Sequence, residues 1–226
     1  MIRINMEKRR LLITGCGRSG TLYATGIWRA LGLDIRHERP IPPNGVIGDD
    51  GMASWFMAAD DPEPPSGPSA LDYEFDVVIQ QVRHPLRVIA SMAQFILREG
   101  KRAPGYIEQN VPETRLSADE QYYLDHKHQL ILKASRYWYY WNVLAEAKAD
   151  ATVKVEDLNL QLPHLCDLVG IDYQSGVLEG IPEDVNARHL HIQDEPWVVD
   201  WEEIKSLDTR LYENIRDLAA TYGYNE

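Results

Sequence analysis

A glycine-rich stretch near the beginning of the chain contains residue types that bind phosphate. Residues 15–21 read GCGRSGT and directly follow the apolar run at 11–14. Arg18 supplies a positive charge, and the hydroxyls of Ser19 and Thr21 can donate hydrogen bonds. If Gly20 ends the turn and a helix follows, the unpaired N–H groups of its first turn also favour an anion. This combination predicts a site for the phosphate or phosphosulfate part of a nucleotide.

Other nucleotide-binding patterns compete for the same stretch. Glycines at 15, 17 and 20 satisfy the dinucleotide pattern G-x-G-x-x-G, with Asp34 and Glu38 as acidic candidates for the ribose. That pattern holds a pyrophosphate through backbone N–H groups, so it leaves Arg18 without a role. The triphosphate pattern G-x-x-x-x-G-K-[ST] fails because Thr21 stands where its lysine belongs. A phosphosulfate explains the stretch best, and an NAD(P)-dependent oxidoreductase is the alternative.

A second candidate anion-binding segment, VRHPLRVIAS, spans residues 82–91. It follows a β-branched run, and Pro85 stands where the first turn of a helix tolerates a missing N–H. Arg83 can form two parallel hydrogen bonds with a phosphate dianion. Ser91 lies about two helical turns beyond Pro85 and can add a hydroxyl donor. The dinucleotide-binding pattern does not predict the pair Arg83 and Ser91.

The two segments together resemble the sulfotransferases that use 3′-phosphoadenosine 5′-phosphosulfate, nearer to the bacterial and carbohydrate-type members. GRSGTLY at 17–23 is similar to the 5′-phosphosulfate loop of the family, in which lysine is usual at the position of Arg18 and some carbohydrate sulfotransferases have arginine. VRHPLRVIAS is similar to the 3′-phosphate segment. The resemblance covers most of residues 10–160, including GMASW at 51–55 and KVEDL at 154–158.

This resemblance implies roles for individual residues. Arg18 would stabilise charge on the oxygen that bridges sulfur and phosphorus as the sulfuryl group leaves. Arg83 and Ser91 would bind the 3′-phosphate, Tyr23 would contact the adenine, and Arg188 would close over the 3′-phosphate. The full set implied to bind the donor is Gly17, Arg18, Ser19, Gly20, Thr21, Tyr23, Arg83, Ser91 and Arg188. The chemistry of the family needs no metal, so none is expected.

An acceptor hydroxyl has a pKa far above neutrality and needs a general base as it attacks sulfur. Glu38 is the first candidate, because it follows the second expected strand where polysaccharide sulfotransferases place a catalytic glutamate. His37 is the alternative, since imidazole suits proton transfer near pH 7. The two side chains would point in opposite directions if the strand continued through both residues. A protein that binds the nucleotide without a working base is a further possibility.

The elements that must position these residues alternate between strand and helix. Strands are expected near 11–14, 33–37, 76–82 and 151–155, and helices after the glycine-rich turn, from Pro85, over 117–148, after 155 with an interruption at Pro163, and from 201 to about 222. A surface loop is expected at about 60–72, where Pro, Gly, Ser and acidic residues gather. This order predicts one α/β domain over 1–226, a three-layer α/β/α arrangement with a central parallel sheet. The resemblance narrows it to the sulfotransferase branch of the P-loop nucleoside triphosphate hydrolase-like fold.

Composition limits the partners and the compartment. There are 23 basic and 35 acidic residues, a net charge of −12, and no basic run, which argues against a surface that coats nucleic acid. The 2 cysteines lack metal-site spacing and are expected to be free thiols. With no apolar run that would span a membrane, we expect a cytoplasmic protein without membrane insertion. The acceptor would be a small molecule or a carbohydrate, and the sequence leaves its identity and the oligomeric state open.

Overall fold

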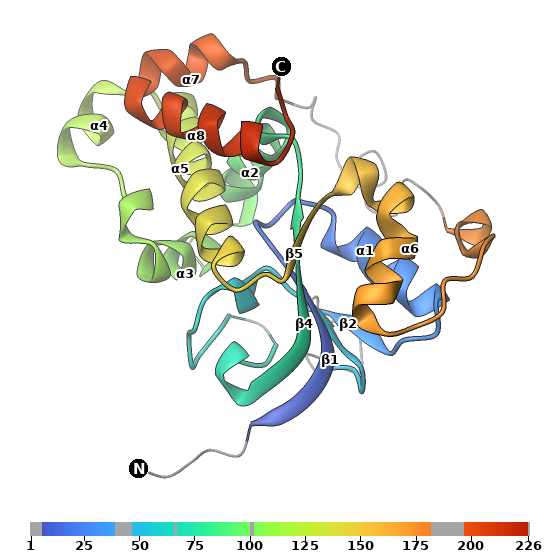
Figure 1. Cartoon of the computed structure of the whole chain (residues 1–226). Helices are drawn as coiled ribbons and strands as arrows, with labels where there is room; N and C mark the ends of the chain where they lie inside the picture. The colour runs from blue at the N-terminus through green and yellow to red at the C-terminus, as the bar shows by residue number, and fades with distance from the viewer. Residues whose placement is uncertain (1–5, 39–46, 66, 100–101, 182–196, 226) are drawn as a thin grey trace.

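A computed structural model describes residues 6–38, 47–65, 67–99, 102–181 and 197–225. Its centre is a five-stranded parallel sheet in the order β2-β3-β1-β4-β5 (Figure 1). The strands are β1 (Glu7–Thr14), β2 (Ile35–His37), β3 (Gly51–Ala53), β4 (Tyr73–Val82) and β5 (Ala151–Lys154). The helices are α1 (Thr21–Ala30), α2 (Pro85–Glu99), α3 (Arg102–Asn110), α4 (Ala118–Tyr123), α5 (His126–Glu146), α6 (Leu158–Val169), α7 (Trp201–Leu207) and α8 (Thr209–Thr221).

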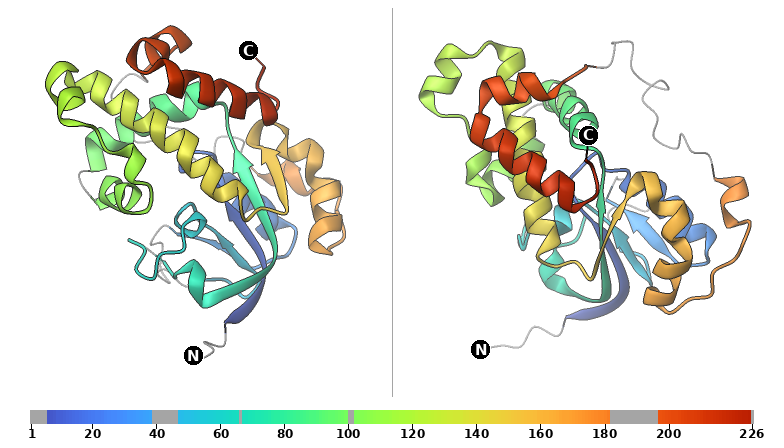
Figure 2. Two further views of the ribbon diagram at one scale, coloured as in Figure 1. Left: turned by 60° about the vertical axis from the view of Figure 1, so that its left-hand side comes forward. Right: turned by 45° about the horizontal axis from the view of Figure 1, so that its top comes forward.

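Helices cover both faces of the sheet, so the three-layer α/β/α prediction is confirmed. Helices α1 and α6 lie on one face, and α2, α5 and α8 lie on the other, as the views of Figures 1 and 2 agree. Strand β1 alternates accordingly: Leu11 and Ile13 join the core under α1 and α6, whereas Leu12 packs with Met52 on the opposite face. The parallel sheet between two helical layers agrees with the α/β class expected from the sequence.

Four strands lie at the predicted positions, although β1 and β4 begin earlier than predicted, at Glu7 and Tyr73. A fifth strand was not predicted. Strand β3 (Gly51–Ala53) lies between β2 and β1 and pairs with both in parallel. All three of its residues are buried. Gly51 permits the close approach, because a Cβ at this position would lie 1.8 Å from the carbonyl oxygen of Leu11.

Three of the predicted helices have different boundaries. The segment expected to be helical over 117–148 is two helices, because Asp125 caps α5 by accepting a hydrogen bond from the backbone N–H of His128 at 2.9 Å. Likewise Asp208 caps α8 and divides the predicted last helix in two. Helix α6 runs through Pro163 without the expected interruption. Its buried face, which includes Leu162 and Leu165, packs on the sheet and outweighs the local cost of the proline.

In the predicted loop at about 60–72, the described residues (60–65 and 67–72) form no strand and only a short 3₁₀ turn at Ala70–Asp72. It is anchored to the rest of the domain by Asp61, which is only 4% exposed. The Asp61 carboxylate accepts hydrogen bonds from the side chains of Gln109 at 3.2 Å and Asn110 at 2.9 Å, at the end of α3. These two hydrogen bonds connect the excursion to the end of α3.

Candidate functional site

The candidate residues gather at one edge of the sheet, where the parallel strands end. Strand β1 ends at Thr14 and leads into the glycine-rich loop, and β4 ends at Val82, directly before Arg83. Strand β2 ends at His37, directly before Glu38. Ligands of parallel α/β sheets bind at this carboxyl edge. The fold thus brings the two predicted anion-binding segments and both candidate bases to the same edge.

The loop presents the open end of a helix. Gly20 precedes α1 with φ 90°, and α1 has no side chain that caps its first N–H groups. Arg18 has φ 74° and is the one residue other than glycine with positive φ in the described ranges. Left-handed backbone at a bulky residue is uncommon and points to a functional constraint. A backbone of this shape and the dipole of α1 favour an anion at this end of the helix.

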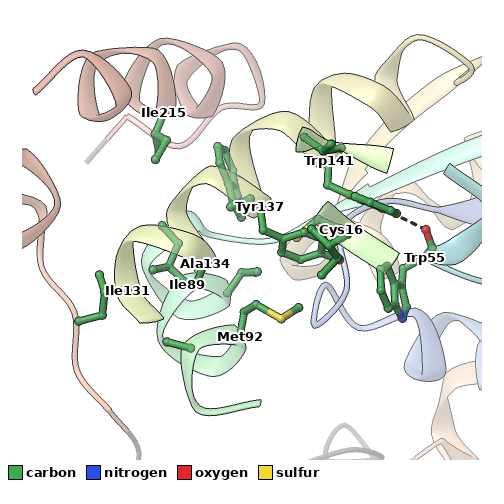
Figure 3. Close-up of a cluster of buried hydrophobic side chains, with 14 of the residues drawn as sticks. Cys16, Trp55, Ile89, Met92, Ile131, Ala134, Tyr137, Trp141 and Ile215 are labelled. Atoms are coloured by element: carbon green, nitrogen blue, oxygen red, sulfur yellow. Dashed lines mark hydrogen bonds between the residues drawn. The ribbon is translucent and has the colours of Figure 1, made fainter. Parts of the chain in front are cut away.

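Buried side chains hold the loop from beneath. Tyr137 of α5 is 1% exposed, and its hydroxyl accepts a hydrogen bond from the Gly17 N–H at 2.5 Å. Gln81 of β4 is 0% exposed and donates from Nε2 to the carbonyl oxygen of Ser19 at 2.7 Å. Figure 3 shows Tyr137 beside Cys16, the loop residue before Gly17. The loop shape is therefore set by α5 and β4 as well as by its own glycines.

Replacing Tyr137 with phenylalanine is expected to destabilise the protein by about 1–3 kcal/mol, because the buried Gly17 N–H loses its acceptor. For a chain of this size that corresponds to a fall in Tm of about 2–4 °C for each kcal/mol. Thermal and urea unfolding measure the change. Tyr140→Phe is the matched control, since Tyr140 lies on the same helix and is only half-buried. Equal stability of the two variants would contradict the role of Tyr137.

The two predicted phosphate segments are in direct contact. Arg18 donates from Nε to the hydroxyl oxygen of Ser91 at 3.0 Å. Arg83 donates from Nη1 to the carbonyl oxygen of Arg18 at 3.4 Å, across 65 positions of sequence. The glycine-rich loop and the start of α2 therefore form one continuous site. The physical basis is that β1 and β4 are neighbours in the sheet, with Thr14 in register with Gln80.

Arg83 is a half-buried cation in this site. Within the described ranges no carboxylate oxygen lies within 4.0 Å of its guanidinium. Burial lowers the pKa of Arg83 from its usual value, and the negative charge of Glu156 opposes this effect. The Glu156 carboxylate is itself held by the Tyr224 hydroxyl at 2.7 Å and the His84 N–H at 3.5 Å. A half-buried guanidinium of this kind suits an anionic ligand.

The candidate bases lie next to the loop and next to each other. The Nε2 atom of His37 is 3.0 Å from the hydroxyl oxygen of Thr21 and 3.6 Å from Oε1 of Glu38. The side chains of His37 and Glu38 are only 10% and 9% exposed. The two side chains do not diverge, because β2 ends at His37 and the chain bends at Glu38. The structure thus joins residues that sequence reasoning treated as separate alternatives.

Three other residues predicted to bind the donor are Ser19, Tyr23 and Arg188. Ser19 is fully buried. Tyr23 is half-buried, packs against the core under α1 and α6, and donates from its hydroxyl to Oδ1 of Asn159 at 3.0 Å. Arg188 lies outside the described residues. The contacts of Tyr23 explain its position by packing, and its predicted adenine contact stays a prediction.

Tyr137 and Gln81 are the site residues that sequence reasoning missed. Gln81 carries a recognisable signal, since it is an amide within the strand VVIQQV whose other residues are mostly apolar. Tyr137 is one of five consecutive aromatic residues at 137–141, and nothing in that run marks one of them as a partner of the glycine-rich loop. Its contact with Gly17 spans 120 positions and has no local signature.

The described part of the chain contains neither a cluster of metal-ligating side chains nor a helix that could cross a membrane. Within the described ranges no group of three His, Cys, Asp or Glu side chains could hold a metal ion. The Nδ1 atom of His128 lies 2.8 Å from the carboxylate of Asp125, within hydrogen-bonding distance. Among the helices of the described chain, none is long and apolar enough to cross a membrane.

Comparisons with known proteins add a structural likeness. No family model matches the chain, and no curated protein matches its sequence. Among solved structures, the chain is similar to the sulfotransferase domain of the Synechococcus PCC 7002 olefin synthase, with a TM-score of 0.47 and 13% identity. The likeness covers 98% of this chain and 96% of that domain.

Proposed function

We propose that this protein is a sulfotransferase that moves a sulfuryl group from 3′-phosphoadenosine 5′-phosphosulfate to an acceptor hydroxyl. The observation that carries the proposal is the contact of Arg18 with both Ser91 and Arg83. This contact brings two segments that contain arginine and suit phosphate side by side. The proposed donor is a nucleotide with phosphoryl groups at both its 5′ and 3′ positions. A simple mononucleotide or dinucleotide fingerprint does not require the second segment.

In the proposed donor complex, the 5′-phosphate lies against the open N-terminus of α1 and the Thr21 hydroxyl. The 3′-phosphate lies against Arg83 and Ser91, with the bidentate geometry that guanidinium offers to phosphate. Arg18 lies between the two, because it contacts Ser91 through its side chain and Arg83 through its carbonyl. Each of these residues lies in, or close to the end of, a helix or strand of the three-layer arrangement.

The transfer step follows from these positions. The acceptor hydroxyl gives its proton to the carboxylate of Glu38 as its oxygen forms a bond to sulfur. The bond between sulfur and the bridging oxygen breaks, and its electron pair stays on the 5′-phosphate. The Arg18 guanidinium and the α1 N–H groups stabilise that developing charge. Alignment of donor and acceptor supplies the rest of the rate enhancement.

The acceptor is proposed to be a carbohydrate or a small molecule that carries a hydroxyl. The preference for carbohydrate comes from the arginine at position 18 and the glutamate at position 38, the pattern that the sequence shares with carbohydrate-type sulfotransferases. Glu38 is 7% exposed, so an acceptor hydroxyl has to reach into the site to contact it. A slender acceptor group meets that requirement better than a protein surface does.

Calorimetric titration with 3′-phosphoadenosine 5′-phosphate, NAD and ATP in separate experiments tests the proposal. Binding of the bisphosphate alone is expected, because it is the ligand of the three that has a 3′-phosphate for Arg83. Binding of NAD without the bisphosphate would instead support the oxidoreductase alternative. Of the two acidic candidates for the ribose in that alternative, Asp34 lies before β2, where its carboxylate accepts from the Asp49 N–H at 3.0 Å. Glu38 directly follows the end of β2, where a ribose would bind, so the calorimetric comparison decides between the two functions.

A further inference from the structure

The contact between the glycine-rich loop and His37 suggests a connection between donor binding and the base. Thr21 is 6% exposed and lies at the first position of α1. Its hydroxyl oxygen is 3.0 Å from Nε2 of His37, and the same nitrogen is 3.6 Å from Oε1 of Glu38. A single ring nitrogen therefore faces both the phosphate cradle and the candidate base.

A threonine hydroxyl has one proton to donate, and this limits the possible hydrogen-bond patterns. Without a ligand, the Thr21 O–H can donate to an unprotonated Nε2, or its oxygen can accept from a protonated Nε2. A phosphate dianion has acceptor oxygens only. Once Thr21 donates to phosphate, its bond to His37 persists only if Nε2 carries the proton.

We propose that Thr21 and His37 form a relay: phosphate bound in the loop accepts the Thr21 hydrogen bond and so favours the His37 tautomer with its proton on Nε2, beside Glu38. Nε2 takes this proton from water, and the proton on Nδ1 is released to water. With Nε2 protonated, that nitrogen cannot accept a proton from the acceptor hydroxyl, and Glu38 is left as the base. His37 is then a positioning residue, which orients its N–H toward Thr21 and Glu38. Glu38 is therefore left as the base only when the phosphate of the donor is bound in the loop. This inference rests on the proposed function, because the phosphate is that of the donor.

Nitrogen-15 NMR of the histidine rings tests the relay in the full chain, with 3′-phosphoadenosine 5′-phosphate as the probe. There are 7 histidines, so the His37 signal is assigned by its loss in His37→Asn. In the wild type, saturation with the bisphosphate is expected to move the His37 signals to those of a ring protonated at Nε2. Thr21→Ser keeps the hydroxyl and should keep the response, whereas Thr21→Val, measured at saturation, should lose it.

Thr25→Val is the matched control. Thr25 lies one turn further along α1, is 5% exposed, and donates from its hydroxyl to the Thr21 carbonyl oxygen at 2.9 Å. Loss of this hydroxyl removes a buried hydrogen bond of the helix without touching His37, so the NMR response should persist. A purely structural role of Thr21 would affect both valine variants alike.

The outcomes separate the relay from the proposed function. If the wild type binds the bisphosphate and the His37 signals do not change, the relay is wrong and the proposed function stands. The relay is also wrong if Thr21→Val responds like the wild type. If calorimetry detects no binding of the bisphosphate to the wild type, the proposed function fails, and the relay fails with it.

Discussion

Replacement of Arg83 with alanine is expected to weaken the binding of 3′-phosphoadenosine 5′-phosphate by at least about 30-fold, which corresponds to about 2 kcal/mol. The physical reason is the loss of a half-buried, charge-assisted contact with the 3′-phosphate. The effect should be specific to that group. Affinity for adenosine 5′-monophosphate, which lacks the 3′-phosphate, should change little. Calorimetric titration of both ligands into both proteins gives the comparison.

Arg29→Ala is the control for net charge. Arg29 is exposed in the last turn of α1, away from the end of this helix that meets the loop. Its replacement removes the same charge as Arg83→Ala and should leave both affinities unchanged. Equal losses for the two nucleotides in Arg83→Ala would indicate general damage to the site. An unchanged affinity for the bisphosphate would show that Arg83 does not bind its 3′-phosphate.

The second large effect is expected from Glu38→Gln, which should lower kcat by about 10²–10⁴-fold. Glutamine keeps the size of the side chain but cannot take the proton of the acceptor hydroxyl. Donor affinity should stay close to that of the wild type, because the proposed phosphate contacts come from other residues. Conversion of 3′-phosphoadenosine 5′-phosphosulfate to the bisphosphate, followed with a panel of hydroxyl acceptors, measures kcat, and calorimetry measures donor affinity.

Glu213→Gln provides the matched control, since Glu213 is exposed on α8 and its change should leave turnover intact. Full turnover in Glu38→Gln together with lost turnover in His37→Asn would assign the base to His37. A wild-type protein that binds the donor and sulfonates no acceptor would favour the hypothesis of a nucleotide-binding protein without catalysis.

The sequence predicted the layers of the fold because the neighbouring strands β1 and β4 contain apolar runs, at 11–14 and 77–79, and because the turns that follow contain glycine or proline. Strand β3 was missed because it has only three residues, Gly51–Ala53, one of which is a glycine. Its pairing with β1 and β2 depends on long-range contacts. The breaks at Asp125 and Asp208 were missed for another reason: a capping aspartate can lie inside an otherwise unbroken periodic pattern.

The candidate site was predicted as two separate segments, and the structure adds how they meet. Residue types and spacing located the glycine-rich loop and Arg83, because phosphate recognition needs local charge and open N–H groups. The contact of Arg18 with Ser91 depends on the neighbouring positions of β1 and β4, which no local pattern encodes. The approach of His37 to Glu38 depends on where β2 ends, and strand boundaries are the least predictable feature of a sequence.

The most direct test of the proposed function is a crystal structure of the complex with 3′-phosphoadenosine 5′-phosphate. We expect the 3′-phosphate within hydrogen-bonding distance of Arg83 and Ser91, and the 5′-phosphate at the N-terminus of α1 beside Thr21. A nucleotide bound elsewhere, or bound with its 3′-phosphate away from Arg83, would contradict the proposed donor site.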